Sequence, residues 1–254
     1  MRLRDALRLR PGEVAAFVGG GGKTTAMFRL AAELASDGQH VITTTTTHLG
    51  ISQLVLAPIH LLAEEVDPAR LERALSQHRH ALITGSINPT LGKATGVSET
   101  FIHDLRQLPD LAAILVEADG ARQRSFKAPD EHEPAIPTIA SLVVIVVGLD
   151  VLGQPLKDDF THRPERIAAL TRVPLGAPVT PEMVAEVIAH PRGGLKNIPA
   201  GARACVLLNK AESPTAVDAA RAIAAHLLQS PVIRSVLIGS AQHENSVIEL
   251  HPHP

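Results

Sequence analysis

The sequence FVGGGGKTT at residues 17–25 decides how the rest of the chain is interpreted. The run 13–18 before it predicts a β-strand, and the run 26–34 after it predicts a helix. Glycines let backbone amides turn toward phosphate oxygens, and a helix N-terminus adds partial positive charge at the same point. Strand, glycine loop and helix in this order therefore predict a phosphate-binding loop, or P-loop.

The loop departs from the usual pattern GxxxxGKS/T, because Phe17 stands where the first glycine belongs. Its shorter form, GxxGKTT, occurs in ATP-dependent amide ligases such as the Mur ligases. The alternative is a glycine-rich turn that binds nothing. We expect Lys23 to reach the β- and γ-phosphates and Thr24 to offer its hydroxyl to Mg²⁺. The residues predicted to bind the nucleotide, ATP or GTP, are Gly19, Gly20, Gly21, Gly22, Lys23, Thr24 and Thr25.

Composition limits the possible partners. The chain has 254 residues, 45% of them hydrophobic, and we predict one α/β domain over 1–254. A formal net charge of -2 and the lack of Trp and Tyr argue against nucleic acid as a partner.

The longest apolar run, 142–147, is too short for a membrane span, so we expect a cytoplasmic protein. Cys205 lies in an apolar run, which favours a buried thiol over a catalytic or selenium-carrying one.

The remaining pattern alternates strands and helices. Such alternation predicts a three-layer, doubly wound α/β fold with a mostly parallel sheet of P-loop NTPase type. Residues 85–97 are predicted to form a polar loop, which is either a lid or binding loop or a surface loop without a functional role. The tail 251–254 reads as a frayed terminus, with adventitious metal binding as the alternative. Further strands are predicted at 40–45, 80–84, 111–116, 141–147, 203–208 and 232–238, and helices at 67–78, 98–108 and 216–228.

Polar residues follow several predicted strands, at the sheet edge where ligands bind in open α/β folds. The threonine run 43–47 and His48 end one strand, and Thr46 is a candidate Mg²⁺ ligand. Glu117 and Asp119 end another in a Walker B pattern. Being two residues apart, they point the same way on an extended strand, so either is a candidate for Mg²⁺ and the other for the base.

A charged stretch, 120–134, comes directly after these carboxylates. Arg122 and Lys127 are candidates for offsetting charge on a transferring phosphoryl group, and His132 for acid–base catalysis. A solvated charged loop is the alternative. Further along, Asn209, Lys210 and Glu212 occupy the place of the base-reading NKxD motif of GTPases. Glu212 stands where that motif has Asp, so the sequence does not decide whether the protein binds ATP or GTP.

The chain resembles the YqeC-type family, accessory proteins of selenium-dependent molybdenum hydroxylases. The resemblance implies a P-loop nucleotide-binding protein that helps mature a selenium-containing molybdenum cofactor site, with the hydroxylase or cofactor-biosynthesis proteins as partners. It also implies that Lys127, Glu131, His132 and 162–165 belong to the site. The matching stretches are VGGGGKTT (18–25), the run 43–48, VEADGA (116–121), KAP to EHEP (127–134), HRPE (162–165) and NK (209–210).

Three functions fit these features. The first is an NTPase whose hydrolysis is coupled to delivery of a cofactor component. The second is a transferase or ligase that passes a phosphoryl or nucleotidyl group to a cofactor intermediate, with the charged stretch binding the acceptor. The third is a nucleotide-gated scaffold without turnover.

Overall fold

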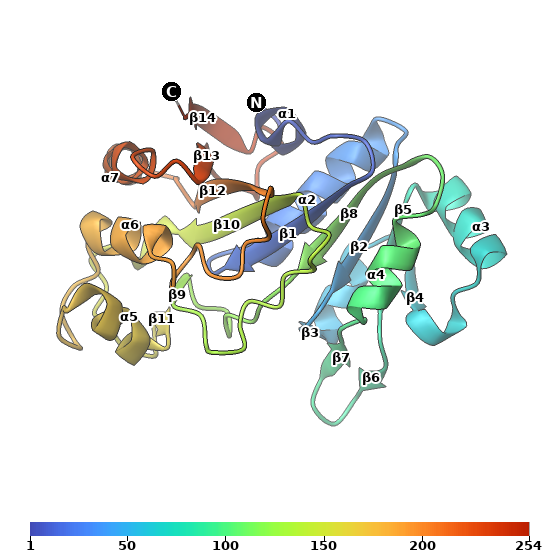
Figure 1. Ribbon diagram of the computed structural model, residues 1–254, viewed down its shortest axis with the longest axis horizontal. Coiled ribbons are helices and arrows are strands. Elements are labelled where there is room, and N and C mark those ends of the chain that lie inside the picture. Colours follow the sequence, from blue (N-terminus) through green and yellow to red (C-terminus); the bar gives the residue numbers. More distant parts are fainter. Residues whose placement is uncertain (254) are drawn as a thin grey trace.

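A nine-stranded sheet forms the framework of the structure, a computed structural model that describes residues 1–253 (Figure 1). Its strand order is β14-β13-β12-β10-β1-β8-β2-β5-β4, and every neighbouring pair is parallel except β13 and β14. The strands are β1 (Glu13–Gly19), β2 (His40–Thr45), β4 (His60–Leu62), β5 (His80–Thr84), β8 (Leu111–Glu117), β10 (Leu142–Gly148), β12 (Arg203–Asn209), β13 (Ile233–Gly239) and β14 (Val247–Pro252).

Helices cover both faces of the sheet, which confirms the predicted three-layer, doubly wound α/β fold. Alternate residues of β1 face opposite sides: Val14, Ala16 and Val18 pack in one apolar cluster, and Ala15 and Phe17 in the other. Helices α1 (Leu3–Leu7) and α2 (Lys23–Ser36) cover the Phe17 side. The opposite side carries α3 (Pro68–His78), α4 (Glu99–Leu105), α5 (Pro164–Thr171), α6 (Pro181–Ala189) and α7 (Pro214–Leu227).

Two predictions about local structure are wrong. Residues 85–97 are not an irregular loop, because β6 (Ile87–Asn88) and β7 (Lys93–Thr95) pair with β3 (His48–Gly50) in a small antiparallel sheet. This sheet fixes the segment to the end of the threonine run. The tail is not frayed at His251 and Pro252, because β14 pairs with β13. Pro254 lies outside the described residues.

The parallel strands bring the candidate site together at their carboxyl ends. Thr45 of β2 and Phe17 of β1 both lie in register with Glu117 of β8. On the other side of β1, Gly19 is in register with Val146 of β10. Gly148, the last residue of β10, is in register with Asn209 of β12. The glycine loop therefore leaves the centre of the sheet between the acidic end of β8 and the end of β12. No helix within residues 1–253 is long and apolar enough to cross a bilayer.

Candidate nucleotide-binding site

The glycine loop has a backbone that other residues cannot reproduce. Gly21 and Gly22 have φ of 71° and 115°, in the left-handed region that favours glycine. A Cβ atom on Gly22 would lie 2.4 Å from Nδ2 of Asn209. That same amide donates a 2.7 Å hydrogen bond to the carbonyl of Gly21. The loop is thus shaped by its own glycines and supported from β12.

Lys23 is the first residue of α2, and its side chain folds back under the loop. Its ammonium donates to the carbonyl oxygen of Gly19 at 2.8 Å and lies 3.1 Å from Oδ1 of Asp119. The side chain is 5% exposed. Burial acts to lower the pKa of Lys23, but the attraction of Asp119 and Glu117 outweighs it and raises the pKa. Lys23 is therefore a buried cation next to the loop amides.

Thr24 and Glu117 meet at the entrance to the loop. The hydroxyl of Thr24 donates to Oε2 of Glu117 at 2.6 Å, and the amide of Gln53 donates to Thr24 Oγ1 at 3.2 Å. Burial raises the pKa of Glu117, and the attraction of Lys23 only partly offsets this rise. A hydroxyl and a carboxylate in contact are the oxygen donors that Mg²⁺ takes from a P-loop protein. These two residues fit a Mg²⁺ ion shared with nucleotide phosphates. Within residues 1–253 there is no cluster of three or more His, Cys, Asp or Glu that would hold a metal without such phosphates.

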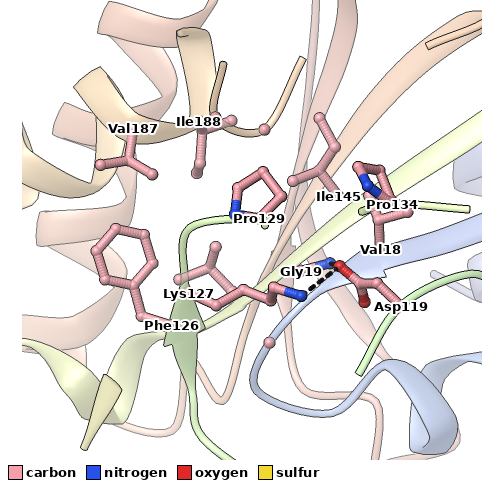
Figure 2. Close-up of a pocket in the computed structure, with 14 residues that line it drawn as sticks. Val18, Gly19, Asp119, Phe126, Lys127, Pro129, Pro134, Ile145, Val187 and Ile188 are labelled. Atoms are coloured by element: carbon pink, nitrogen blue, oxygen red, sulfur yellow. Dashed lines mark hydrogen bonds and ion pairs between the residues drawn. The ribbon is translucent and has the colours of Figure 1, made fainter. Parts of the chain in front are cut away.

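Asp119 has different contacts from Glu117. Strand β8 ends at Glu117, so the two-residue spacing does not place both carboxylates on one strand face. Oδ2 of Asp119 accepts from the Gly19 amide at 2.9 Å and lies 3.1 Å from the Lys127 ammonium (Figure 2). With its other oxygen near Lys23, Asp119 joins two buried lysines beneath the loop.

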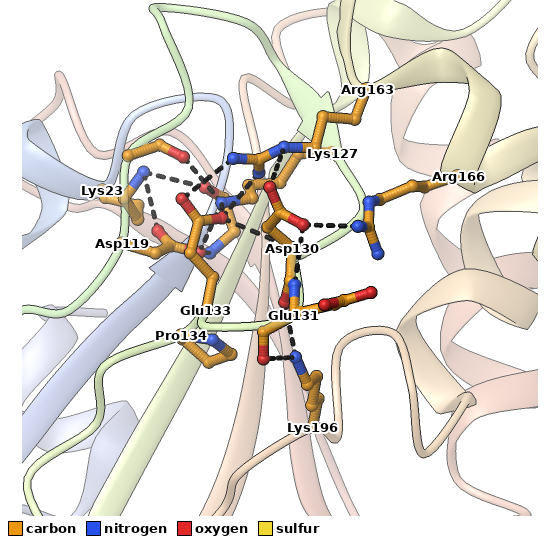
Figure 3. Close-up of polar contacts among 12 residues, drawn as sticks. Lys23, Asp119, Lys127, Asp130, Glu131, Glu133, Pro134, Arg163, Arg166 and Lys196 are labelled. Atoms are coloured by element: carbon orange, nitrogen blue, oxygen red, sulfur yellow. Dashed lines mark hydrogen bonds and ion pairs between the residues drawn. The ribbon is translucent and has the colours of Figure 1, made fainter.

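Glu133 and Arg163 extend this chain of ion pairs (Figure 3). Lys127 binds Glu133 at 2.6 Å, and Glu133 accepts a 2.6 Å hydrogen bond from Arg163. Partial burial acts to raise the pKa of Glu133, but Arg163 and Lys127 lower it to about 2. A nearby cavity of about 20 Å³, lined partly by Phe126 and Ile188, has room for about one water molecule and none for a substrate.

An open cleft of about 850 Å³ lies on the outer side of the loop. Lys23, Thr24 and Glu117 line it, together with Thr46 and Arg122. The other residues that line the cleft are Gly21, Gly22, Thr25, Thr47, His48, Gly50, Gln53, Lys93, Gly120, Ala121, Gln123, Arg124, Glu133, His162, Arg163 and Lys210. The lining carries several cations and few carboxylates, which suits a polyanionic ligand.

The two histidines near the charged stretch lie in different environments. His132, predicted for acid–base catalysis, is exposed and is not among the cleft-lining residues. His162 of β11 (Thr161–His162) lines the cleft and is buried, and its strand pairs with β9 (Phe126–Lys127). Burial lowers the pKa of His162 to about 4, with Arg163 and Lys127 adding to the effect. His162 is therefore a neutral imidazole at pH 7.

The threonine run divides into a structural and a cleft-facing part. Thr43, Thr44 and Thr45 are fully buried, and their hydroxyls bind His80, the Ile83 carbonyl and the Glu117 carbonyl. Thr46 lines the cleft, but its hydroxyl donates to the carbonyl of Ala135 at 2.8 Å and not to Thr24 or Glu117.

The three residues expected to read the base also separate. Asn209 is buried and binds the loop through Gly21, while its Oδ1 accepts from the Ala241 amide at 2.8 Å. Lys210 lines the cleft, and its ammonium lies 2.7 Å from Asp150. Glu212 does not line the cleft and accepts a hydrogen bond from Ser240. Of the three, Lys210 is the residue in position to touch a nucleotide.

Sequence reasoning missed Gln53 and did not assign Lys93 or Arg163 individually. Gln53 reaches Thr24 because the short helix η1 (Ile51–Leu56) folds back from β3, and no local pattern signals that. Lys93 reaches the cleft through the unexpected pairing of β7 with β3. Arg163 carried a signal, the HRPE stretch, although its position beside Glu133 follows only from the fold.

The glycine loop between β1 and α2, with Lys23 and the Thr24–Glu117 pair, defines a P-loop nucleotide-binding protein. More narrowly, the chain belongs to the YqeC protein family, whose family model matches residues 15–165. The protein YqeC of Escherichia coli (strain K12) is 34% identical over 197 residues, covering 78% of this chain and 75% of that protein.

Two solved structures have a looser overall similarity. Chloroplast FtsY from Physcomitrella patens is 14% identical with a TM-score of 0.47, and the match covers 98% of this chain. The signal recognition particle receptor FtsY from Elizabethkingia anophelis is 12% identical with a TM-score of 0.44 and 96% of this chain covered. The chain spans 65% and 67% of the lengths of these two structures.

Proposed function

We propose that this protein is a Mg²⁺-dependent ATPase or GTPase that acts in maturation of the selenium-containing molybdenum cofactor site of a molybdenum hydroxylase. The observation that carries the nucleotide part is the 2.6 Å contact between Thr24 Oγ1 and Glu117 Oε2 at the mouth of the glycine loop. This contact supports Thr24 and Glu117 as the protein ligands of a Mg²⁺ ion, because both lie next to the loop amides and the lysine that would bind phosphate. The pathway part of the proposal rests on the resemblance to the YqeC-type family alone, and no contact in the site supports it.

Each residue has a distinct role in the proposed reaction. Lys23 and the loop amides bind the β- and γ-phosphates, and Thr24 and Glu117 would hold a Mg²⁺ ion that would offset phosphate charge. Asp119 is a positioning residue, because it lies beneath the loop and holds Lys23 in place. The cleft-facing cation Arg122 offsets charge on the transferring phosphoryl group.

Neutral His162 is proposed to orient the attacking water, in place of His132. Water adds to the γ-phosphorus as the bond from that phosphorus to the β–γ bridging oxygen breaks, and the proton lost by the water passes to the phosphate product, giving a nucleoside diphosphate and phosphate. An imidazole with a pKa of about 4 is unprotonated at neutral pH and is able to orient this water through a ring nitrogen. Its position in the cleft supports the assignment.

A second candidate function is phosphoryl or nucleotidyl transfer to an anionic acceptor. The cleft is near the upper end of the volumes usual for small-molecule sites, about 300–1,000 Å³. Lys93 and Arg122 line it, and neither side chain has a hydrogen-bond or ion-pair partner within residues 1–253. Two unpaired cations in a large cleft are suited to an acceptor bound beside the nucleotide.

Product analysis tests these functions. Purified protein is incubated with Mg²⁺ and either ATP or GTP, with and without a partner hydroxylase, and nucleoside diphosphate, phosphate and pyrophosphate are measured. We expect diphosphate and phosphate in equal amounts, lost in Thr24→Ala and Glu117→Gln and retained in Glu72→Gln, an exposed carboxylate of α3. Products formed only with an acceptor would support transfer. Nucleotide binding with no turnover under any condition would support the third function, a nucleotide-gated scaffold.

The pathway needs its own test. A hydroxylase isolated from cells that carry only Lys23→Ala protein is compared with hydroxylase from wild-type cells for activity and bound selenium. We expect both to fall while the amount of hydroxylase polypeptide is unchanged. Full activity and selenium content in the variant cells would contradict the pathway and leave nucleotide binding unaffected.

A further inference from the structure

A second concave site lies at the amino ends of the parallel strands, whereas the nucleotide cleft lies at their carboxyl ends. It has a volume of about 420 Å³ and lies among α1, the first residues of β12 and β13, and the end of β14. Figure 1 shows α1, β13 and β14 together beside the N-terminus. The amino ends of β12 and β13 line this site, whereas the carboxyl ends of the parallel strands line the nucleotide cleft. We call it the arginine pocket.

The arginine pocket gathers four arginines among apolar side chains. Arg8, Arg10, Arg203, Arg234 and His253 line it, and no Asp or Glu of the described residues does. The chain as a whole carries a formal net charge of -2, so this concentration of arginine is local. Its floor is partly apolar, with Leu7 and Leu250 beside Cys205 and Ser235.

One arginine is held rigidly. The guanidinium of Arg203 donates to Oε2 of Glu13 at 2.8 Å and to the carbonyl of Leu7 at 3.0 Å. Both of its terminal nitrogens are therefore engaged, while its Nε is buried without a hydrogen-bond partner. Arg203 is therefore a fixed part of the pocket wall, and Glu13 offsets its charge.

The other three arginines are unpaired. Arg8 follows α1 with φ of 48°, Arg10 lies in the turn before β1, and Arg234 is the second residue of β13. Within residues 1–253 the side chains of these three have no hydrogen-bond or ion-pair partner, and all three residues are exposed. Their charges are thus available to a ligand, and mutual repulsion falls when an anion binds among them.

We propose that the arginine pocket binds a small organic polyanion with two or more phosphate or carboxylate groups. A concave site of this volume is in the range of small-molecule sites, about 300–1,000 Å³. Planar guanidinium groups bind carboxylate and phosphate oxygens in pairs, which gives both charge and geometry for such a ligand. A nucleic-acid backbone is less suitable, because the cations gather in one hollow and do not follow a stripe across the surface.

Isothermal titration calorimetry tests this with pyrophosphate and citrate as probes. Pyrophosphate is expected to bind the phosphate loop as well, so its titrations, including those of the test and control variants, are made in the Lys23→Ala background. The test variant is Arg8→Ala/Arg10→Ala/Arg234→Ala. The control, Arg73→Ala/Arg106→Ala/Arg192→Ala, removes three exposed arginines elsewhere. We expect at least about tenfold weaker binding of both probes in the test variant, since each lost charge-assisted hydrogen bond is worth about tenfold, and unchanged binding in the control.

Several results would overturn the proposal. One is equal weakening in the test and control variants, which would mean general charge attraction. Another is the absence of citrate binding and of pyrophosphate binding to Lys23→Ala protein. A third is binding of duplex DNA or of an acidic peptide to the pocket with neither small anion bound. Because Lys93 and Arg122 remain in the nucleotide cleft of Lys23→Ala protein, the loss of binding in the test variant, and not binding by itself, identifies the arginine pocket.

Discussion

Asp119 gives the sharpest prediction from the structure. The substitution Asp119→Asn keeps an oxygen that can accept from the Gly19 amide but removes the charge between Lys23 and Lys127. Asp119 is 2% exposed, and its oxygens lie 3.1 Å from each ammonium. Lys127 retains Glu133 at 2.6 Å, so Lys23 is the cation that loses its closest anion.

The expected loss follows from burial. Removing one partner of a buried ion pair costs about 3 to 5 kcal/mol, because the remaining charge stays out of water. For a chain of this length that lowers Tm by about 6 to 10 °C. Nucleotide supplies phosphate charge near Lys23, so bound Mg²⁺-nucleotide should restore part of the lost stability. The nucleotide-induced gain should therefore be larger in the variant than in the wild type.

The assay is urea and thermal unfolding followed by circular dichroism, without nucleotide and at saturating Mg²⁺-nucleotide. Glu72→Gln, which neutralises an exposed carboxylate on α3, is the matched control and should change stability by less than about 0.5 kcal/mol. A loss below about 1 kcal/mol in Asp119→Asn, or a nucleotide-induced gain no larger than in the wild type, would refute the reasoning.

Three further predictions follow from individual residues. Glu133, whose pKa is lowered from 4.5 to about 2, stabilises the fold above pH 4.5, and this contribution is lost as pH falls toward 2. Acid unfolding of Glu133→Gln should show a weaker pH dependence in that window; an unchanged curve would contradict it. His162→Gln should lower kcat at least about tenfold, and the acidic limb of the wild-type pH profile should fall near 4, not 6.5. His78→Gln, on an exposed residue of α3, should keep full kcat. Gly22→Ala should lose nucleotide binding, because its Cβ meets an amide at 2.4 Å and its φ is 115°; wild-type affinity would show that the loop adapts.

The central strands of the fold were predictable because they are continuously apolar and covered on both faces. β10 is buried along its whole length, and the predicted strand 141–147 matches it within one residue. β14 was missed because its residues are half exposed and include His251 and Pro252, so it carries neither an apolar run nor a clean alternation. The pair β6 and β7 was missed because strands of two and three residues leave no periodicity to detect.

The site was predictable where one local pattern fixes the chemistry. The order of glycines, Lys23 and Thr24 determines a phosphate loop, and Glu117 ends an apolar strand. The roles of Glu117 and Asp119 could not be separated, since that depends on β8 ending at Glu117. His162 lies in the cleft because β11 pairs with β9, a contact between segments distant in sequence.

The expectation of one domain over 1–254 and the expected protein partners stay predictions. Cys205 is buried beside Ser235, and burial raises its pKa, as predicted for a core thiol.

The most direct test of the central claim, that residues 19–25 form a nucleotide-binding loop, is a thermal-shift titration. Wild-type and Lys23→Ala proteins are melted with ATP or GTP, each with and without Mg²⁺. We predict that at least one nucleotide raises Tm of the wild type in a Mg²⁺-dependent way and that Lys23→Ala shows no shift. A full nucleotide-induced shift in Lys23→Ala would contradict the assignment of the loop.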